Sequence, residues 1–289
     1  MVEKGRAIAH GAVTIVNAIS CGLGAALGVK LKTEAEVRLT GEPGVIIGKI
    51  LSDPYESTIL IEKSVNLVLE RFGLEREYGA YVETKSNIPI ARGLKSSSAA
   101  ANAIVLATLA AIGKKLSDVE VVKLGVDAAI KAGVTITGAF DDACASYFGD
   151  IVITDNMQRR ILQRVPVGDY IVLIYVPPKK SYTAKSDVKK MKIIGRQIEV
   201  VHEIALNGNH WEAMTINGIL YSSVLGYDTS IVFETLAAGA EAAGLSGKGP
   251  AIATVAREER IEDVLSVLKR YEGEILKTKV NHEKASVLK

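Results

Sequence analysis

Apolar and polar positions alternate over short stretches of the first ninety residues, which is the pattern of half-buried β-strands. The strands that we expect cover residues 12–18, 31–39, 44–50 and 78–85. One stretch breaks the series, because Ile61, Val65 and Val68 recur at helical spacing before Gly73. The pattern predicts an amphipathic helix over residues 57–72 that packs on a sheet.

Helices and strands alternate along the rest of the chain. An alanine-rich apolar segment predicts a buried helix over residues 98–112, and the capping-box spacing of Ser117 and Glu120 begins another helix that ends near Lys131. Further strands are expected in the runs DIVITD, YIVLIYV, PAIATVA and EILKTKV, and further helices over residues 185–205, 210–221, 230–243 and 261–271. This mixture predicts an α+β fold with a change of domain between residues 150 and 170.

Composition and charge narrow the class of protein. The chain has 289 residues, 48% hydrophobic and 5% aromatic, with a net charge of +2. These values are typical of a globular protein and argue against disordered, fibrous, membrane and nucleic-acid-binding classes. The first residues lack the apolar core of a signal peptide, and the longest apolar run is too short for a membrane span, so we expect a cytoplasmic protein. The two cysteines and four histidines have no zinc-site spacing.

A polar loop, GLKSSSAA, stands at residues 93–100 before the buried alanine-rich helix. The first turn of a helix has backbone N–H groups without intrahelical partners, which favour an anion, and Gly93 would let the backbone approach one closely. Lys95 could neutralise phosphate charge, and a serine hydroxyl could reach a magnesium ion. Capping by Ser97 or Ser98 needs only one serine, so we favour phosphate binding.

Two other loops carry glycines or carboxylates that packing does not require. Gly247 and Gly249 flank Lys248, which indicates a backbone that contacts another loop or a ligand. Asp141 and Asp142 lie in a segment of small residues. A carboxylate there could accept a proton or bind a divalent ion, and an acidic helix N-terminus explains the pair equally well.

The segment HGAVTIVNAISCGLGAALG mixes hydroxyl and amide side chains with glycines. Thr14 and Asn17 could line a polyhydroxy ligand or belong to a tight hairpin, and the sequence leaves both open. The run GLGAALG at residues 22–28 misses the dinucleotide-binding pattern by one residue, and the chain has no P-loop motif. Rossmann and P-loop folds are therefore disfavoured.

Taken together, the loops resemble those of the GHMP kinases, and the resemblance spans the chain. The signature P-x-x-x-G-L-x-S-S-[AS] is met by Pro89, Gly93, Leu94 and residues 96–98, and the glycine loop at 244–250 is similar to the C-terminal loop of the family. Lys95 departs from the glycine that most members have there. The opening segment GAVTIVNAISCGLGAALG also differs from the usual first motif of the family. These two departures, together with the segment TITGAFDDACASYFGD, are similar to the archaeal shikimate kinase branch.

The resemblance implies a GHMP kinase fold with ATP and substrate at the junction of two domains. Residues 1–160 would form a domain like domain 2 of ribosomal protein S5, and residues 161–289 a ferredoxin-like domain. The residues implied to bind ATP are Pro89, Ala91, Arg92, Gly93, Leu94, Lys95, Ser96, Ser97, Ser98 and Ala99. Ser97 and Asp127 would bind Mg²⁺. Asp141 aligns with the catalytic aspartate of the family, and Asp142 is the competing choice.

The implied activity is transfer of the γ-phosphoryl group of ATP to a hydroxyl of shikimate, giving shikimate 3-phosphate in aromatic amino-acid (chorismate) biosynthesis. Substrate contacts are expected from Thr14, Asn17, Gly247, Lys248 and Gly249. Arg92, Lys95 or the lysines at 179, 180 and 185 would bind the substrate carboxylate, although a lysine run is more often a solvated face.

Two alternatives remain open: another GHMP activity, such as homoserine or mevalonate kinase, and a non-catalytic nucleotide- or RNA-binding protein. We expect partners to be small molecules rather than nucleic acid or a membrane, and the sequence leaves room for a homo-oligomer.

Overall fold

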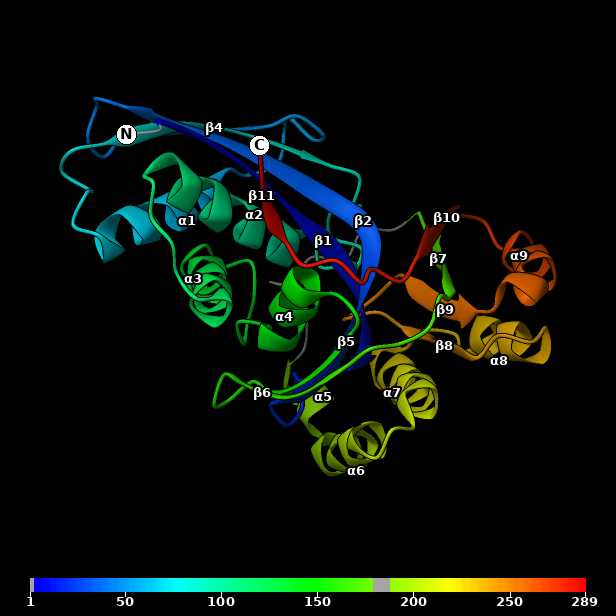
Figure 1. The fold of residues 1–289 in the computed structure, drawn as a ribbon. Helices are drawn as coiled ribbons and strands as arrows, with labels where there is room; N and C mark the ends of the chain where they lie inside the picture. Colours follow the sequence, from blue (N-terminus) through cyan, green and yellow to red (C-terminus); the bar gives the residue numbers. More distant parts are fainter. Residues whose placement is uncertain (1–2, 179–187) are drawn as a thin grey trace.

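Two β-sheets organise the chain in the computed structural model, which describes residues 3–178 and 188–289 (Figure 1). The first sheet contains β1 (Lys4–Val16), β2 (Leu23–Thr40), β3 (Ile46–Ile50), β4 (Gly79–Ser86), β5 (Ile151–Asp155), β6 (Arg160–Val165) and β11 (Ser286–Leu288). Its order is β11-β1-β2-β4-β3, with β5 paired to β2 and β6 to β5. Strand β11 thus returns the end of the chain to the sheet that begins it.

The second sheet contains β7 (Ile171–Val176), β8 (Ala242–Leu245), β9 (Ile252–Ala256) and β10 (Glu274–Lys279), in the antiparallel order β10-β7-β9-β8. Along the chain, helices connect β7 to β8 and β9 to β10, which is the ferredoxin-like arrangement that we expected. The chain passes between the sheets after β6. The exact division at residue 160 stays a prediction.

Helices cover one face of each sheet (Figure 1). The first sheet carries α1 (Ile59–Arg71), α2 (Ser96–Ala111), α3 (Asp118–Lys131) and α4 (Phe140–Phe148); the later helices are α5 (Val188–Lys192), α6 (Gly195–Leu206), α7 (His210–Leu225), α8 (Ser230–Ala237) and α9 (Ile261–Leu268), the last preceded by a 3₁₀ turn at Glu258–Arg260. Helix α7 contacts both β1 and β8 and so joins the two sheets. No helix in the described ranges has the length and apolarity that a membrane crossing requires.

Helix α2 is buried along most of its length, as its composition predicted. Small side chains let it lie directly on β1: a Cβ atom added to Gly5 would come within 2.0 Å of the Ala107 carbonyl oxygen. The Asn102 side chain donates a 2.9 Å hydrogen bond to the Ala143 carbonyl oxygen and ties α2 to α4. The helix is therefore a rigid support for the loop before it.

Several predicted elements were wrong in extent. Strands β1 and β2 are far longer than expected, and the glycine-rich run at 22–28 is part of β2 and its entry turn. Position 28 of β2 needs glycine because Gly149 packs against it: a Cβ atom there would come within 2.8 Å of the Gly149 Cα atom. A contact distant in sequence determines this glycine, so local pattern could not assign it.

Two predicted helices also needed correction. The helix expected over 230–243 ends at Ala237, and Ala242–Leu245 pairs with β9 as strand β8. Helix α7 packs directly on this strand, since a Cβ atom added to Gly218 would lie 2.4 Å from the Gly244 Cα atom. The helix expected over 185–205 is instead α5 and α6, separated at residues 193–194. Its first residues, with Lys179, Lys180 and Lys185, lie outside the described residues.

Candidate active site

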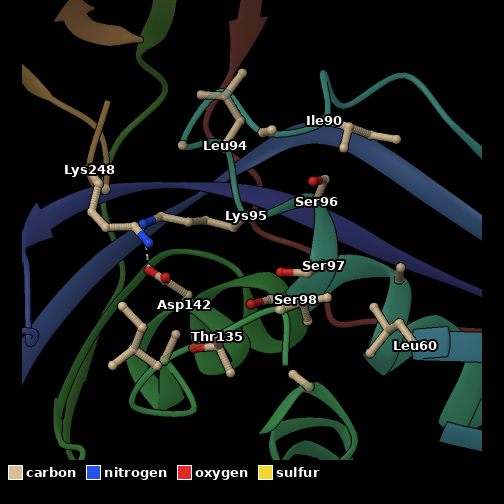
Figure 2. Close-up of a pocket in the computed structure, with 18 of the residues that line it drawn as sticks. Leu60, Ile90, Leu94, Lys95, Ser96, Ser97, Ser98, Thr135, Asp142 and Lys248 are labelled. Atoms are coloured by element: carbon tan, nitrogen blue, oxygen red, sulfur yellow. Dashed lines mark ion pairs between the residues drawn. The ribbon is translucent and has the colours of Figure 1, made fainter. Parts of the chain in front are cut away.

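A cavity of about 360 Å³ lies where the two sheets meet. Its walls come from residues 90–91 and 93–98, which include the start of α2, from residues 133–139 before α4 with Asp141 and Asp142 in it, from the β8–β9 loop at 247–249 and from the turn after β1 at 17–19. Figure 2 shows the charged side chains Lys95, Lys248 and Asp142 at one end and the apolar Leu60 at the other. The cavity therefore offers a polar and an apolar region to one elongated ligand.

Helix α2 begins at Ser96, with Lys95 as its N-cap residue and no side chain capping it. Among the described residues, the hydroxyl groups of Ser96, Ser97 and Ser98 have no hydrogen-bond partner. Helix capping, the alternative explanation of the serines, is thus wrong. The N-terminal amides and the positive end of the helix dipole are available to an anion in the cavity.

The loop before α2 has a constrained backbone. Ala91, Gly93 and Lys95 have positive φ values of 57°, 86° and 64°. Gly93 is required, because a Cβ atom there would lie 2.1 Å from the Ser246 carbonyl oxygen. The Ser246 hydroxyl donates a 2.7 Å hydrogen bond to the Gly93 carbonyl oxygen. The two glycine loops, which the sequence presented separately, therefore form one unit.

Thr14 and Asn17 support this unit from β1. The Thr14 hydroxyl accepts a 2.8 Å hydrogen bond from the Gly247 amide, and the Asn17 side chain donates one of 2.8 Å to the Gly247 carbonyl oxygen. Thr14 is buried and does not line the cavity, so this geometry does not support its predicted substrate contact. Asn17 does line the cavity, but its amide is committed to the loop.

The two adjacent aspartates occupy the first turn of α4 and have different surroundings. Asp142 forms a 2.9 Å ion pair with Lys95, and both side chains are nearly buried, at 14% and 8% exposed. Asp141 is 3% exposed and accepts a 2.7 Å hydrogen bond from the Asn156 side chain. Gly24 makes room for it, because a Cβ atom there would lie 2.6 Å from the Asp141 Oδ2 atom.

Burial and charge tune two groups at this end of the cavity. Burial, assisted by the charge of Asp142, raises the pKa of Asp141 to about 7, against the opposing effects of Lys95 and Asn156. Burial, together with the charge of Lys95, lowers the pKa of Lys248 to about 8. A carboxyl group whose pKa lies near neutrality fits proton acceptance from a substrate hydroxyl.

Some predicted residues lie away from the cavity. Asp127 forms a 2.7 Å ion pair with Arg159, is 40% exposed and does not line the cavity, so this geometry does not support its predicted role as a magnesium ligand. The Arg92 guanidinium donates to the carbonyl oxygens of Pro177 and Pro178, and Ala99 is fully buried. Arg92, Ala99 and Pro89 therefore support the loop rather than face the cavity.

Other cavity residues escaped prediction. Residues 133–138, between α3 and α4, line the cavity, as do Leu60 of α1, Ile90 and Glu56. These residues form no motif of their own, and only the fold brings them to the serine loop. The run TITG before Asp141 is part of the resemblance to the archaeal branch, but the pattern does not predict that these residues line the cavity.

Comparisons with known proteins agree with this geometry. The family model described as GHMP kinases N terminal domain matches residues 60–150. A protein of Methanosarcina mazei named shikimate kinase is 46% identical over 287 residues, covering 99% of this chain and 97% of its own. The crystal structures of homoserine kinase from Cytophaga hutchinsonii and of mevalonate kinase from Methanococcus jannaschii both align with TM-scores of 0.75 at 18% identity.

These alignments cover nearly all of each chain: 100% of this chain and 98% of the homoserine kinase, and 97% and 98% for the mevalonate kinase. At that identity the solved structures show the fold. The full-length relative shows more, since it shares close to half of its residues with this chain. The chain belongs to the GHMP kinase family, and within that family it is similar over nearly its full length to archaeal shikimate kinases.

Proposed function

We propose that this protein is a kinase that transfers the γ-phosphoryl group of ATP to a hydroxyl of shikimate, giving shikimate 3-phosphate. The observation that carries the proposal is the 46% identity over 99% of the chain to an archaeal protein named shikimate kinase. The cavity adds physical support, since an uncapped helix N-terminus, two lysines and a buried carboxyl group meet at one end of it. Phosphoryl transfer needs positioning and charge neutralisation of this kind.

ATP would bind with its phosphates at the N-terminal amides of α2 and its base in the apolar region around Leu60 and Ile90. Ser97 fits a magnesium ligand, because its hydroxyl lies in the first turn and has no partner among the described residues. Those residues contain no cluster of three metal-ligating side chains, so phosphate oxygens and water would complete the coordination. Bound there, Mg²⁺ would neutralise phosphate charge.

The acceptor hydroxyl would lie between the phosphate site and Asp141. The oxygen of the acceptor hydroxyl forms a bond to the γ-phosphorus while the bond from that phosphorus to the β,γ-bridging oxygen breaks. ADP leaves with the electron pair of the broken bond. The Asp141 carboxylate takes the hydroxyl proton, which its raised pKa permits at neutral pH. Asn156 holds that carboxyl group in place through its side-chain amide.

A substrate panel tests the proposal. The purified protein is incubated with ATP, Mg²⁺ and either shikimate, homoserine or mevalonate, and ADP release is followed by a coupled assay with mass-spectrometric identification of the product. We expect turnover of shikimate to exceed that of the others by at least about 10²-fold, because a site that hydrogen-bonds substrate hydroxyls discriminates strongly. Robust turnover of another alcohol without shikimate phosphorylation would replace the substrate but keep the kinase.

The non-catalytic alternative makes a different prediction for the same assay. A nucleotide- or RNA-binding protein would bind ATP without producing ADP in the presence of any acceptor. The Asp141→Asn variant serves as the matched control, because it should retain ATP affinity and lose turnover. Equal, trace-level ADP release by both proteins would support the non-catalytic alternative.

A further inference from the structure

Two lysines from different loops lie at the charged end of the cavity near one carboxylate, and only one of them is paired with it. Lys95 reaches Asp142 from the N-cap of α2, and Lys248 reaches the same point from the β8–β9 loop (Figure 2). These are the only lysines or arginines among the described residues that line the cavity. The ion pair satisfies Lys95, whereas no carboxylate in the described ranges lies within ion-pair distance of the Lys248 ammonium group.

We propose that Lys248 supplies the cation that contacts the phosphoryl group during its transfer, and that Asp142 acts as the counter-ion that positions Lys95 rather than as a proton acceptor. This inference rests on the proposed kinase function and deepens it by separating the roles of the two aspartates and the two lysines. An ammonium group with no committed partner at the phosphate end of a cavity is available to an incoming anion.

The loop that carries Lys248 is held from several sides. Thr14 and Asn17 bind the backbone of Gly247, and the Tyr227 hydroxyl donates a 3.2 Å hydrogen bond to the Lys248 carbonyl oxygen. Ser246 links the loop to Gly93. A charged group on a fixed loop stabilises developing charge without reorganising first, which is the requirement for lowering an activation barrier.

Lys95 and Asp142 constrain each other in a way that suits positioning. The Lys95 ammonium group lies in the space above Gly247, where an added Cβ atom would come within 3.1 Å of it. Without Asp142, two ammonium groups would face each other in a poorly solvated site. The charge of Asp142 therefore offsets the repulsion between Lys95 and Lys248. Asp141, which has no ion-pair partner among the described residues, remains the group that receives the hydroxyl proton.

Substitution of Lys248 tests the first half of the proposal. Lys248→Met should lower kcat by about 10²-fold, the usual effect of removing one donor to a transition-state charge, and change the KM of the acceptor less than about threefold. Lys248→Arg, which keeps the charge, should recover most of that loss. Lys115→Met, an exposed lysine in the loop at the far end of α2, is the matched control and should leave both parameters unchanged.

Two results would overturn this half. An unchanged kcat in Lys248→Met would remove the lysine from the reaction. A rise confined to the KM of the acceptor would make Lys248 an anchor for an acidic group of the acceptor instead. Loss of fold is controlled by thermal melting and by binding of a non-hydrolysable ATP analogue, and methionine matches the length of the half-buried lysine stem.

A double-mutant cycle tests the second half. Lys95→Gly leaves Asp142 without its partner, so Asp142 should attract Lys248 and kcat should fall about as far as in Lys248→Met. Asp142→Asn in the Lys95→Gly background should then raise kcat at least about fivefold. If Asp142 accepted the proton, the double variant would be no more active than Lys95→Gly, and Asp142→Asn alone would be as impaired as Asp141→Asn. All variants are assayed with whichever acceptor the wild-type protein turns over, so a failure to use shikimate would refute the proposed substrate without deciding this question.

Discussion

Replacing Asp141 with asparagine is expected to abolish turnover and, at the same time, to stabilise the folded protein at alkaline pH. The Asp141 carboxyl group is buried and has a pKa of about 7, against about 3.9 in an unfolded chain. Because the folded-state pKa is raised, the folded state binds the proton more tightly than the unfolded state. Ionised Asp141 therefore costs stability, and the cost grows as pH rises from about 4 to about 7.

The magnitude follows from the two pKa values. At about 1.4 kcal/mol per unit, the cost is about 4 kcal/mol above pH 7 and about 1–2 kcal/mol at pH 5. Asparagine carries no charge and keeps the acceptor for Asn156, but its amide nitrogen cannot accept the backbone hydrogen bond that Asp142 gives the carboxyl group, which we expect to cost roughly 1–3 kcal/mol at every pH. The difference in stability between Asp141→Asn and wild type should therefore shift by about 3 kcal/mol, in favour of the variant, between pH 5 and pH 8.

Differential scanning fluorimetry at both pH values measures this shift. At roughly 2–3 °C per kcal/mol for a chain of this size, the melting-temperature difference between variant and wild type should rise by about 6–8 °C from pH 5 to pH 8. Asp127→Asn makes the same chemical change at a 40% exposed, ion-paired site and should show no such shift. A pH-independent difference for Asp141→Asn would refute the raised pKa and with it the reason for assigning Asp141 as the base.

Four further outcomes are expected. The pH profile of kcat/KM should rise as Asp141 deprotonates near pH 7 and fall as Lys248 deprotonates near pH 8, with a maximum close to pH 7.5; a flat profile from pH 6 to 9 would contradict both assignments. Gly93→Ala should weaken ATP binding at least about tenfold by calorimetry, because its Cβ atom would meet the Ser246 carbonyl oxygen, whereas Gly113→Ala, with positive φ but open space, should keep the affinity at a cost of about 1 kcal/mol in stability. Ser97→Ala should raise the Mg²⁺ concentration needed for half-maximal activity, and an unchanged requirement would argue against a metal contact. Asp127→Asn should keep activity within about twofold, since its carboxylate faces Arg159.

The sequence predicted those parts of the fold in which local pattern and tertiary packing agree. The alanine-rich segment became the buried helix α2, because a helix that lies on the backbone of β1 at Gly5 needs small side chains, and these were visible in the sequence. The β-branched run at 171–176 became the fully buried strand β7. For both elements, the composition of the segment alone predicts that it is buried.

The sequence could not predict features that depend on contacts distant along the chain. Thr14 and Asn17 had the residue types of a ligand site, but their hydrogen bonds go to Gly247, more than 200 residues away. The place of Asp127 on the helix before the aspartate pair suggests a magnesium ligand, and only the structure shows that its side chain turns to Arg159. Local sequence gives the chemistry of a side chain, whereas the direction in which it points is decided by the fold.

At Lys95, the local backbone conformation and a contact distant along the chain act on the same residue. It has a φ value of 64°, a conformation that costs a non-glycine residue about 1 kcal/mol or more, at a position where glycine would be free of that cost. Its side chain is also 8% exposed, and a buried ammonium group needs a partner, which Asp142 supplies at 2.9 Å. The lysine before the serines and the second aspartate of α4 therefore depend on each other. A chain with glycine at position 95 would leave the carboxylate at 142 without its partner. Lys95→Gly and Asp142→Asn should therefore be tolerated together more readily than either is alone.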